Sequence, residues 1–296
     1  MKLKKILFAT EFNALNLEAL LSLLDLKLAG MEEIILTHII PRDQVAFVPY
    51  GGYLKGEEKR LREEAKIRFE DWLDDVARAG LQVKIVIEVG EPAPQIMKIA
   101  EAEKVDLIVS GKIKRTGLEK VYSSSQTLEL LRRSATIPVY VSKHTPCRDM
   151  DEECGRRLNE HPFVRPLFAT DWSPPSDRAL EFIKVLGKAV QKVDVIHVID
   201  LKEAEEDENS AWERLKAESH DHLDRYCLSL REAGIASEPH LGAGPMAAEV
   251  LRLCAELNST MTILGTTGKN RLRSFFLGSL SREIMKTSHL PTLLVP

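Results

Sequence analysis

The segment LFATE at residues 7–11 returns almost unchanged as LFATD at residues 167–171. A second echo follows in the same order, since LTHII at 36–40 is answered by VIHVI at 195–199. A repeat this long divides the 296-residue chain into two similar halves, each of ordinary domain size. The sequence therefore predicts a tandem protein.

Each half alternates short apolar, β-branched runs with amphipathic helical stretches. This order predicts an α/β fold, two tandem doubly wound domains with five-stranded parallel sheets. Ser173-Pro174 is predicted to begin a helix, with the serine hydroxyl as its cap. The predicted strands lie at 5–9, 34–40, 81–88, 106–109 and 139–141 in the first copy, and at 166–169, 194–199, 261–264 and 292–295 in the second.

A polar stretch from Ser142 to His161 lacks apolar periodicity and is predicted to join the domains, with the boundary near Met150. We expect a first domain at 1–146, a linker at 147–161 and a second domain at 162–296. Within the linker, His144, Cys147, Cys154 and His161 have the side-chain types of a zinc site. Their intervals do not match the paired spacing of structural zinc sites, so no metal is predicted.

The composition limits the classes of partner and compartment. With 41 basic and 45 acidic residues the formal charge is −4, which leaves no broad positive field for nucleic acid. No apolar run reaches membrane-spanning length, and the N-terminal run stops at Glu11 without a cleavage site. Four cysteines are too few for a disulfide framework. A cytoplasmic protein without nucleic-acid or membrane partners is expected.

A glycine-containing turn follows the predicted strand at 261–264 in the second copy. It reads GTTG at 265–268, and GSLS at 278–281 then begins a helix. Glycine lets backbone N–H groups approach a phosphate, and a helix N-terminus adds unpaired donors and a positive dipole end. The spacing matches neither the Walker motif nor the dinucleotide fingerprint. The carboxyl end of the LFATD strand is expected to face the same crevice.

Gly265-x2-Gly268-x9-Gly278-Ser279, with Thr170-Asp171 after the first strand, resembles the ATP-binding signature of the universal stress protein family. The resemblance covers nearly the whole chain. It implies a regulatory role in stress and domains that pair through their last strands. It also implies ATP, ADP or AMP as ligand, with Mg²⁺ as a companion ion. The implied ligand-contacting residues are Ala169, Thr170, Asp171, Val198, Gly265, Thr266, Gly268, Gly278, Ser279 and Leu280.

The first copy departs from this signature. Aligned at Gly111, it has Lys114 and Ser124 where the second copy has glycines, and Glu11 where the second copy has Asp171. These side chains would stand where backbone must approach a ligand. We therefore predict that the first domain is a degenerate, mainly structural copy.

Two other functions remain open at this level. One is a slow ATPase or an autophosphorylating enzyme of the same fold, since Ser279, Ser281, Thr266 and Thr267 are hydroxyls near the predicted phosphates. No nucleophile and base are visible, so no catalytic residue is predicted. The other is a nucleotide-free interaction scaffold. In either case we expect the domains to pair through 139–141 and 292–295, and the chain to form a homodimer.

His38 and His197 occupy matched places in the second predicted strand of each copy. We expect half-buried side chains with a satisfied hydrogen bond and no catalytic role. Lys269, Arg271 and Arg273, between the motif glycines, could neutralise phosphates or simply face water.

Overall fold

The computed structural model describes residues 2–12, 17–47, 52–53, 55–111, 120–143, 161–199, 209–267 and 277–296. Contacts divide the chain into two compact units, residues 2–144 and 145–296. The predicted linker lies outside the described residues except for His161. No helix in the described part of the chain is long and apolar enough to cross a membrane.

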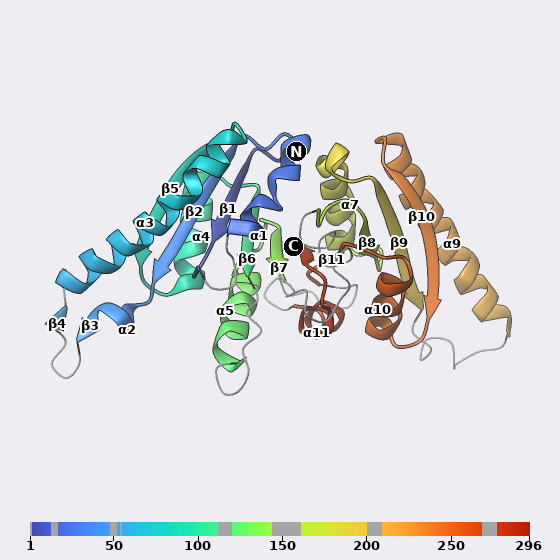
Figure 1. The fold of residues 1–296 in the computed structure, drawn as a ribbon. Helices are drawn as coiled ribbons and strands as arrows, with labels where there is room; N and C mark the ends of the chain where they lie inside the picture. The colour runs from blue at the N-terminus through green and yellow to red at the C-terminus, as the bar shows by residue number, and fades with distance from the viewer. Residues whose placement is uncertain are drawn as a thin grey trace. The chain divides into compact units, whose positions relative to one another are not determined.

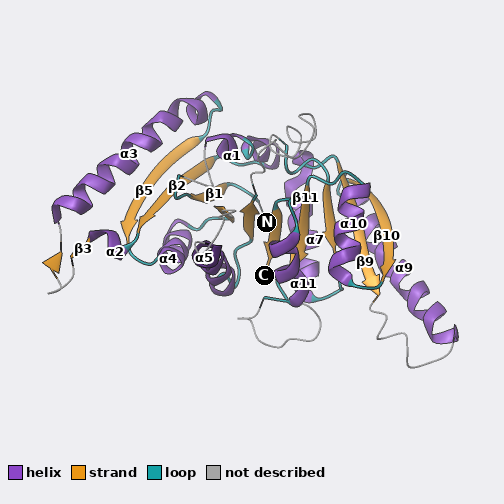
Figure 2. Cartoon of the chain, turned by 60° about the horizontal axis from the view of Figure 1, so that its bottom comes forward, coloured by secondary structure: helices purple, strands orange, loops and turns teal. Residues whose placement is uncertain are grey.

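The first unit is a five-stranded parallel sheet in the order β7-β6-β1-β2-β5 (Figure 1). Helices lie on both faces of the sheet, with α3 on one side and α4 and α5 on the other (Figure 2). A short antiparallel pair, β3 with β4, precedes α3. The elements are β1 (Lys5–Ala9), α1 (Leu17–Leu21), the 3-10 helix η1 (Leu24–Ala29), β2 (Glu33–Ile40), α2 (Arg42–Val45), β3 (Ala46–Phe47), β4 (Gly52–Tyr53), α3 (Lys55–Arg78), β5 (Gln82–Val89), α4 (Pro92–Glu103), β6 (Leu107–Gly111), α5 (Lys120–Arg133) and β7 (Val139–Ser142).

The second unit repeats this plan in the order β10-β9-β8-β11-β12, again all parallel. Helices α7 and α9 contact each other on one face, and α10 packs beside α11 on the other. The elements are β8 (Pro166–Ala169), α7 (Pro174–Leu186), the 3-10 helix η3 (Gly187–Ala189), β9 (Lys192–Ile199), α9 (Asn209–Glu232), β10 (Ala236–Ala243), α10 (Met246–Glu256), β11 (Met261–Gly265), α11 (Ser279–Thr287) and β12 (Thr292–Val295).

The repeated LFAT segment forms the middle strand of each sheet. In β1, Leu7 pairs with Ile35 of β2, and in β8 Leu167 pairs with Asp194 of β9. Because a central parallel strand is covered on both faces, it has a continuous apolar run rather than an alternating one. The predicted tandem α/β fold is thus confirmed, and the nine predicted strands appear with ends shifted by at most two residues.

One strand, β10, has no counterpart among the predicted strands of the second copy. Its sequence ASEPHLGA has little apolar alternation and contains Pro239. Both features follow from its place at the end of the strand order, because an edge strand leaves half of its backbone groups without a ladder partner. A proline is tolerated there, and a sequence rule based on periodicity fails.

Candidate functional site

A cavity of about 390 Å³ opens at the carboxyl ends of β8, β9 and β11. This is the location at which ligands bind in open parallel sheets, and the volume lies in the range of small-molecule sites. Residues predicted from the sequence line it together: Ala169, Thr170, Asp171, Val198, Gly265, Gly278, Ser279 and Leu280.

Of the other two predicted residues, Thr266 does not line the cavity. Thr266 joins the backbone hydrogen bonds instead: its N–H donates to the Val295 carbonyl at 2.8 Å, and its carbonyl accepts from the Gly278 N–H at 2.7 Å. The second bond ties the end of β11 to the residue that caps α11. Gly268, with Lys269, Arg271 and Arg273, lies outside the described residues.

Gly265 is required by packing as well as by the cavity. A Cβ at this position would lie 2.8 Å from the Pro175 Cβ and 3.1 Å from backbone atoms of Pro175 and Ser176. These atoms belong to the first turn of α7, which crosses close to the end of β11. A glycine is therefore needed here even without a ligand.

We expect Gly265→Ala to destabilise the protein by about 1–3 kcal/mol, because backbone of α7 must move to admit the methyl group. Urea unfolding followed by circular dichroism measures this. Gly56→Ala in α3 is the matched control, since nothing lies within 4 Å of a Cβ there. The control substitution should not lower the free energy of unfolding and should stabilise the helix slightly. Equal effects of the two substitutions would contradict the packing role of Gly265.

Asp171 is held by the start of α7. Its Oδ1 accepts from the Ser173 N–H at 3.1 Å and from the Ser176 hydroxyl at 2.8 Å. The helix begins at Pro174 as predicted, but the Ser173 hydroxyl makes no capping bond to it. That hydroxyl instead donates to the Thr267 carbonyl at 3.3 Å, joining the start of α7 to the turn after β11. The predicted capping role is therefore wrong, because the Ser173 hydroxyl is directed at the Thr267 carbonyl and the Ser176 hydroxyl and not at a backbone N–H of the first turn.

An aromatic group borders the cavity next to Asp171. Trp172 adopts a left-handed backbone with φ of 62°, and its ring lies 4.8 Å from the ring of His197 and 4.9 Å from that of His222. The Tyr226 ring meets it edge-on at 5.1 Å, and the Tyr226 hydroxyl donates to Asp177. Burial, with Asp177 adding to it, raises the pKa of the Tyr226 phenol. His222 and Tyr226 were not predicted as neighbours of the site, because α9 is distant from the motif in sequence.

The two matched histidines behave as expected. His38 Nδ1 lies 2.8 Å from the Thr10 carbonyl and His197 Nδ1 lies 2.8 Å from the Thr170 carbonyl, so each ring donates to the end of the central strand. Both rings are half-buried, and burial lowers the pKa of His38. The prediction of a satisfied hydrogen bond is confirmed.

The hydroxyls near the proposed phosphates differ in their surroundings. Ser279 is exposed at the first residue of α11, and Gly278 before it is the N-cap. Ser281 is only 4% exposed, and its hydroxyl donates to the Gly265 carbonyl at 2.9 Å. The first copy has the same bond, from the Thr127 hydroxyl to the Gly111 carbonyl at 3.4 Å. Ser281 therefore anchors α11 to β11.

The first copy has a much smaller cavity at the same place, of about 60 Å³. It is lined by Ala9, Thr10, Glu11, Gly111 and residues of β2, α4 and α5. Such a volume corresponds to a few water molecules and lies below the range of small-molecule sites. Lys114 and the side chain of Ser124, which were predicted to block the site, lie outside what the structure describes.

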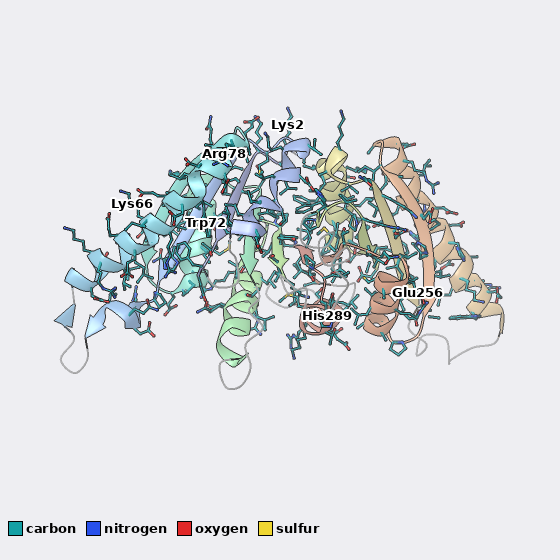
Figure 3. The ribbon with its side chains drawn as sticks, in the orientation of Figure 1. Lys2, Lys66, Trp72, Arg78, Glu256 and His289 are labelled. Carbon is teal, nitrogen blue, oxygen red and sulfur yellow. The ribbon has the colours of Figure 1, made fainter. Side chains whose placement is uncertain are left out.

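Large aromatic side chains pack between α3 and the end of the central strand in the first copy. Phe12 stands where Trp172 stands in the second copy, and it has the same left-handed backbone, with φ of 63°. Its ring lies 4.8 Å from Phe69 and 5.6 Å from Trp72, both on α3. Trp72, labelled in Figure 3, also meets Phe8 of the central strand. In α9 the matching positions are Leu223 and Tyr226, and Tyr226 meets Trp172 in the second copy.

A cluster of charged residues lies at the opposite end of the second sheet. Asp194 in β9 has no exposed surface, and its carboxylate lies 3.0 Å from His240 Nε2, 3.2 Å from Lys192 Nζ and 3.4 Å from Arg165 Nε. Asp194, Glu238 and His240 are close enough to share an ion. However, the Lys192 ammonium already lies between the carboxylates, 2.7 Å from Glu238. The cluster is an ion-pair network.

Comparison with known proteins identifies the family. A sequence model of the universal stress protein family matches residues 2–143 and 164–296. The chain belongs to the universal stress protein family. The two matched segments make it a tandem member. Universal stress protein MJ0577 of Methanocaldococcus jannaschii is 32% identical over 154 residues, which are 47% of this chain and 94% of that protein. MJ0531 of the same organism is 26% identical over 145 residues, 47% of this chain and 85% of its own.

Solved structures agree on the fold of this universal stress protein. A universal stress protein from Archaeoglobus fulgidus superposes with a TM-score of 0.71 at 22% identity, covering 99% of this chain and 96% of the other. Protein PA1789 of Pseudomonas aeruginosa, described as functionally unknown, gives 0.61 at 17% identity, with 99% and 92% covered. At these sequence identities, the similarity shows a shared fold and nothing beyond it.

Proposed function

We propose that this universal stress protein is a regulatory protein whose second domain binds one adenine nucleotide, with ATP as the principal ligand. The observation that carries the proposal is the contrast between the cavities at matched places, about 390 Å³ in the second copy and about 60 Å³ in the first. Eight of the ten residues implied by the family signature line the larger cavity.

The residues of the larger cavity fit the parts of a nucleotide. The first turn of α11, beginning at Ser279, offers backbone N–H groups and a positive dipole end to phosphates. Asp171 can accept a hydrogen bond from a ribose hydroxyl. Val198 and Met246 give the cavity an apolar side suited to a purine ring. A bound Mg²⁺ would offset the charge of phosphates beside Asp171.

The hydrogen bonds of the Ser281 hydroxyl and of His197 favour a regulatory function over a catalytic one. Ser281 is buried and bonded to Gly265, and His197 already donates to Thr170. Slow ATP hydrolysis or phosphorylation of exposed Ser279 remains the alternative, and a nucleotide-free scaffold is the other. A stress-response role, a cytoplasmic location, a linker at 147–161 and pairing through the last strands are further parts of the proposal.

Nucleotide content and stoichiometry test the proposal. Denaturing the purified full chain should release an adenine nucleotide, and calorimetric titration of the emptied protein with ATP should give one site per chain. Asp171→Ala should weaken binding by about tenfold or more, as expected for a lost hydrogen bond to a charged group. Glu11→Ala, the same change in the first copy, should leave affinity unaltered. Two sites, no site, or sensitivity to Glu11→Ala alone would overturn the proposal.

A further inference from the structure

The two domains protect the sheet edges at β5 and β10 differently. In β10 the Gly244 N–H donates to Ile199 of β9, so the backbone groups of the odd-numbered residues face outward. One of them is Pro239, which has no N–H to offer. The Arg231 guanidinium donates a hydrogen bond at 2.8 Å to the Ser237 carbonyl, which also faces outward. The edge of the second sheet is therefore blocked against another strand.

The edge of the first sheet at β5 has no proline to block it. In β5 the N–H groups of Gln82 and Gly90 donate to the β2 side, at 2.9 Å and 3.0 Å. The odd-numbered residues of β5 again face outward, namely Val83, Ile85, Ile87 and Val89. None is proline, and Ile85 stands at the position that Pro239 holds in β10. Among the described side chains, Arg62 of α3 donates to the outward Ile87 carbonyl.

The sequence of β5 is symmetric about Val86 in the character of its side chains. Ile85 and Ile87 flank the centre, Lys84 and Glu88 follow with opposite charges, and Val83 and Val89 come next. The Lys84 and Glu88 side chains are 49% and 50% exposed. A strand with this pattern is complementary to a second copy of itself running antiparallel.

We propose that two copies of this chain associate by antiparallel pairing of their β5 edges about a twofold axis at Val86. In this register Ile85 faces Ile87 of the second copy and Val83 faces its Val89. All four have outward N–H and carbonyl groups, so each pair exchanges two hydrogen bonds. The Ile85 N–H of the second copy replaces Arg62 on the Ile87 carbonyl.

Charge fixes this register and no other. With the axis at Val86, Lys84 lies opposite Glu88 of the second copy, and the pair occurs twice. With the axis moved to Ile85 or Ile87, Lys84 faces Val86 or Gly90 and both charge pairs are lost. Within one chain the two side chains are four residues apart, about 13 Å along the strand, too far to pair with each other. Opposite charges at these places therefore select the partner and the alignment.

Charge reversal with rescue tests the proposal on the full-length chain. Sedimentation equilibrium over a concentration series should show a monomer–dimer equilibrium for the wild type. Lys84→Glu and Glu88→Lys should each lower the association constant at least about tenfold, because both symmetric pairs become repulsive. The double variant should return to within about threefold of the wild type. It restores neither Lys84–Glu103 nor Arg62–Glu88, so rescue reports the contact between copies.

A backbone variant gives an independent measurement. Ile85→Pro copies the proline of the second sheet edge into the first, at an N–H that faces away from β2, and should abolish the dimer. Arg62→Ala removes the guanidinium from the Ile87 carbonyl and should strengthen association. Circular dichroism checks that each variant is folded. A wild-type chain that stays monomeric, a dimer that tolerates Ile85→Pro, or a double variant no better than the single ones would overturn the proposal.

Discussion

Ser279→Glu should weaken ATP binding by about a hundredfold without destabilising the protein. The substitution places a carboxylate at the first residue of α11, where the phosphates of the ligand are proposed to lie. At an effective dielectric constant of about 20, two unit charges about 4 Å apart repel by about 4 kcal/mol, and salt screens part of this. The same carboxylate interacts favourably with the helix N-terminus, so stability should hold or rise slightly. Calorimetric titration and thermal unfolding measure the two effects.

Thr287→Glu is the matched control, because it adds the same charge to the same helix at its last residue. The two positions are eight residues apart, about 12 Å along the helix axis, which exceeds the Debye length at physiological salt. Binding should change less than about threefold. Should both variants lose affinity equally, the effect would be one of overall charge, and the α11 N-terminus would not be the phosphate site.

Asp194→Ala should destabilise the protein by about 2–4 kcal/mol. Removing one member of a buried ion-pair network typically costs about 3–5 kcal/mol, because the partner charges stay behind without compensation. The expected cost is lower here because His240, Lys192 and Arg165 are 21%, 25% and 35% exposed and water can reach them. Urea unfolding at neutral pH measures the loss.

The loss should depend on pH in a defined direction. Burial disfavours the charged form of Asp194, but hydrogen bonds from His240 and Lys192 outweigh it and hold the pKa of this carboxyl below its ordinary value. A carboxyl of this kind contributes stability that is fully present above its unfolded pKa of about 3.9 and is lost as pH falls through the folded pKa. The gap between wild type and Asp194→Ala should stay constant from pH 7 to about 5 and shrink below about 4.

The first copy supplies the control for this prediction. Ile35 and Val86 occupy the places of Asp194 and His240, as the strand registers show. A double variant, Asp194→Ile with His240→Val, should recover to within about 1 kcal/mol of the wild type, because apolar replacement of a buried ion pair is often neutral. A double variant as unstable as Asp194→Ala would show that the single loss arises from packing alone.

The fold could be predicted because the information lies in local patterns that occur twice. The LFAT strand and the glycine turn are each contiguous in sequence, and their places in a parallel sheet follow from chain order. The edge strand β10 was not predicted, because a strand with an exposed side needs no apolar alternation and can contain Pro239. Because a hydrophobic pattern arises from burial, it is a weaker signal for a strand that is less buried.

The site could be predicted where its residues follow strand ends, and not where side chains approach from other elements. Trp172 stands beside predicted Asp171, yet its contact with His222 depends on how α9 packs. Likewise the contact of Phe69 with Phe12 could not be predicted, because it depends on how α3 packs against the end of the central strand. For Gly265, the structure adds a second explanation of the glycine, because α7 passes too close to admit a side chain.

The difference in volume between the two cavities would separate the two domains in their response to metabolite supply. A domain that binds no ligand, as proposed for the first copy, has a melting temperature set by its sequence. A domain that binds ligand gains RT ln(1 + [L]/Kd), about 2.7 kcal/mol at a hundred times Kd. If the second domain binds a nucleotide as proposed, only that domain should lose stability on nucleotide depletion, and the chain would register energy status as a difference in heat resistance between its halves.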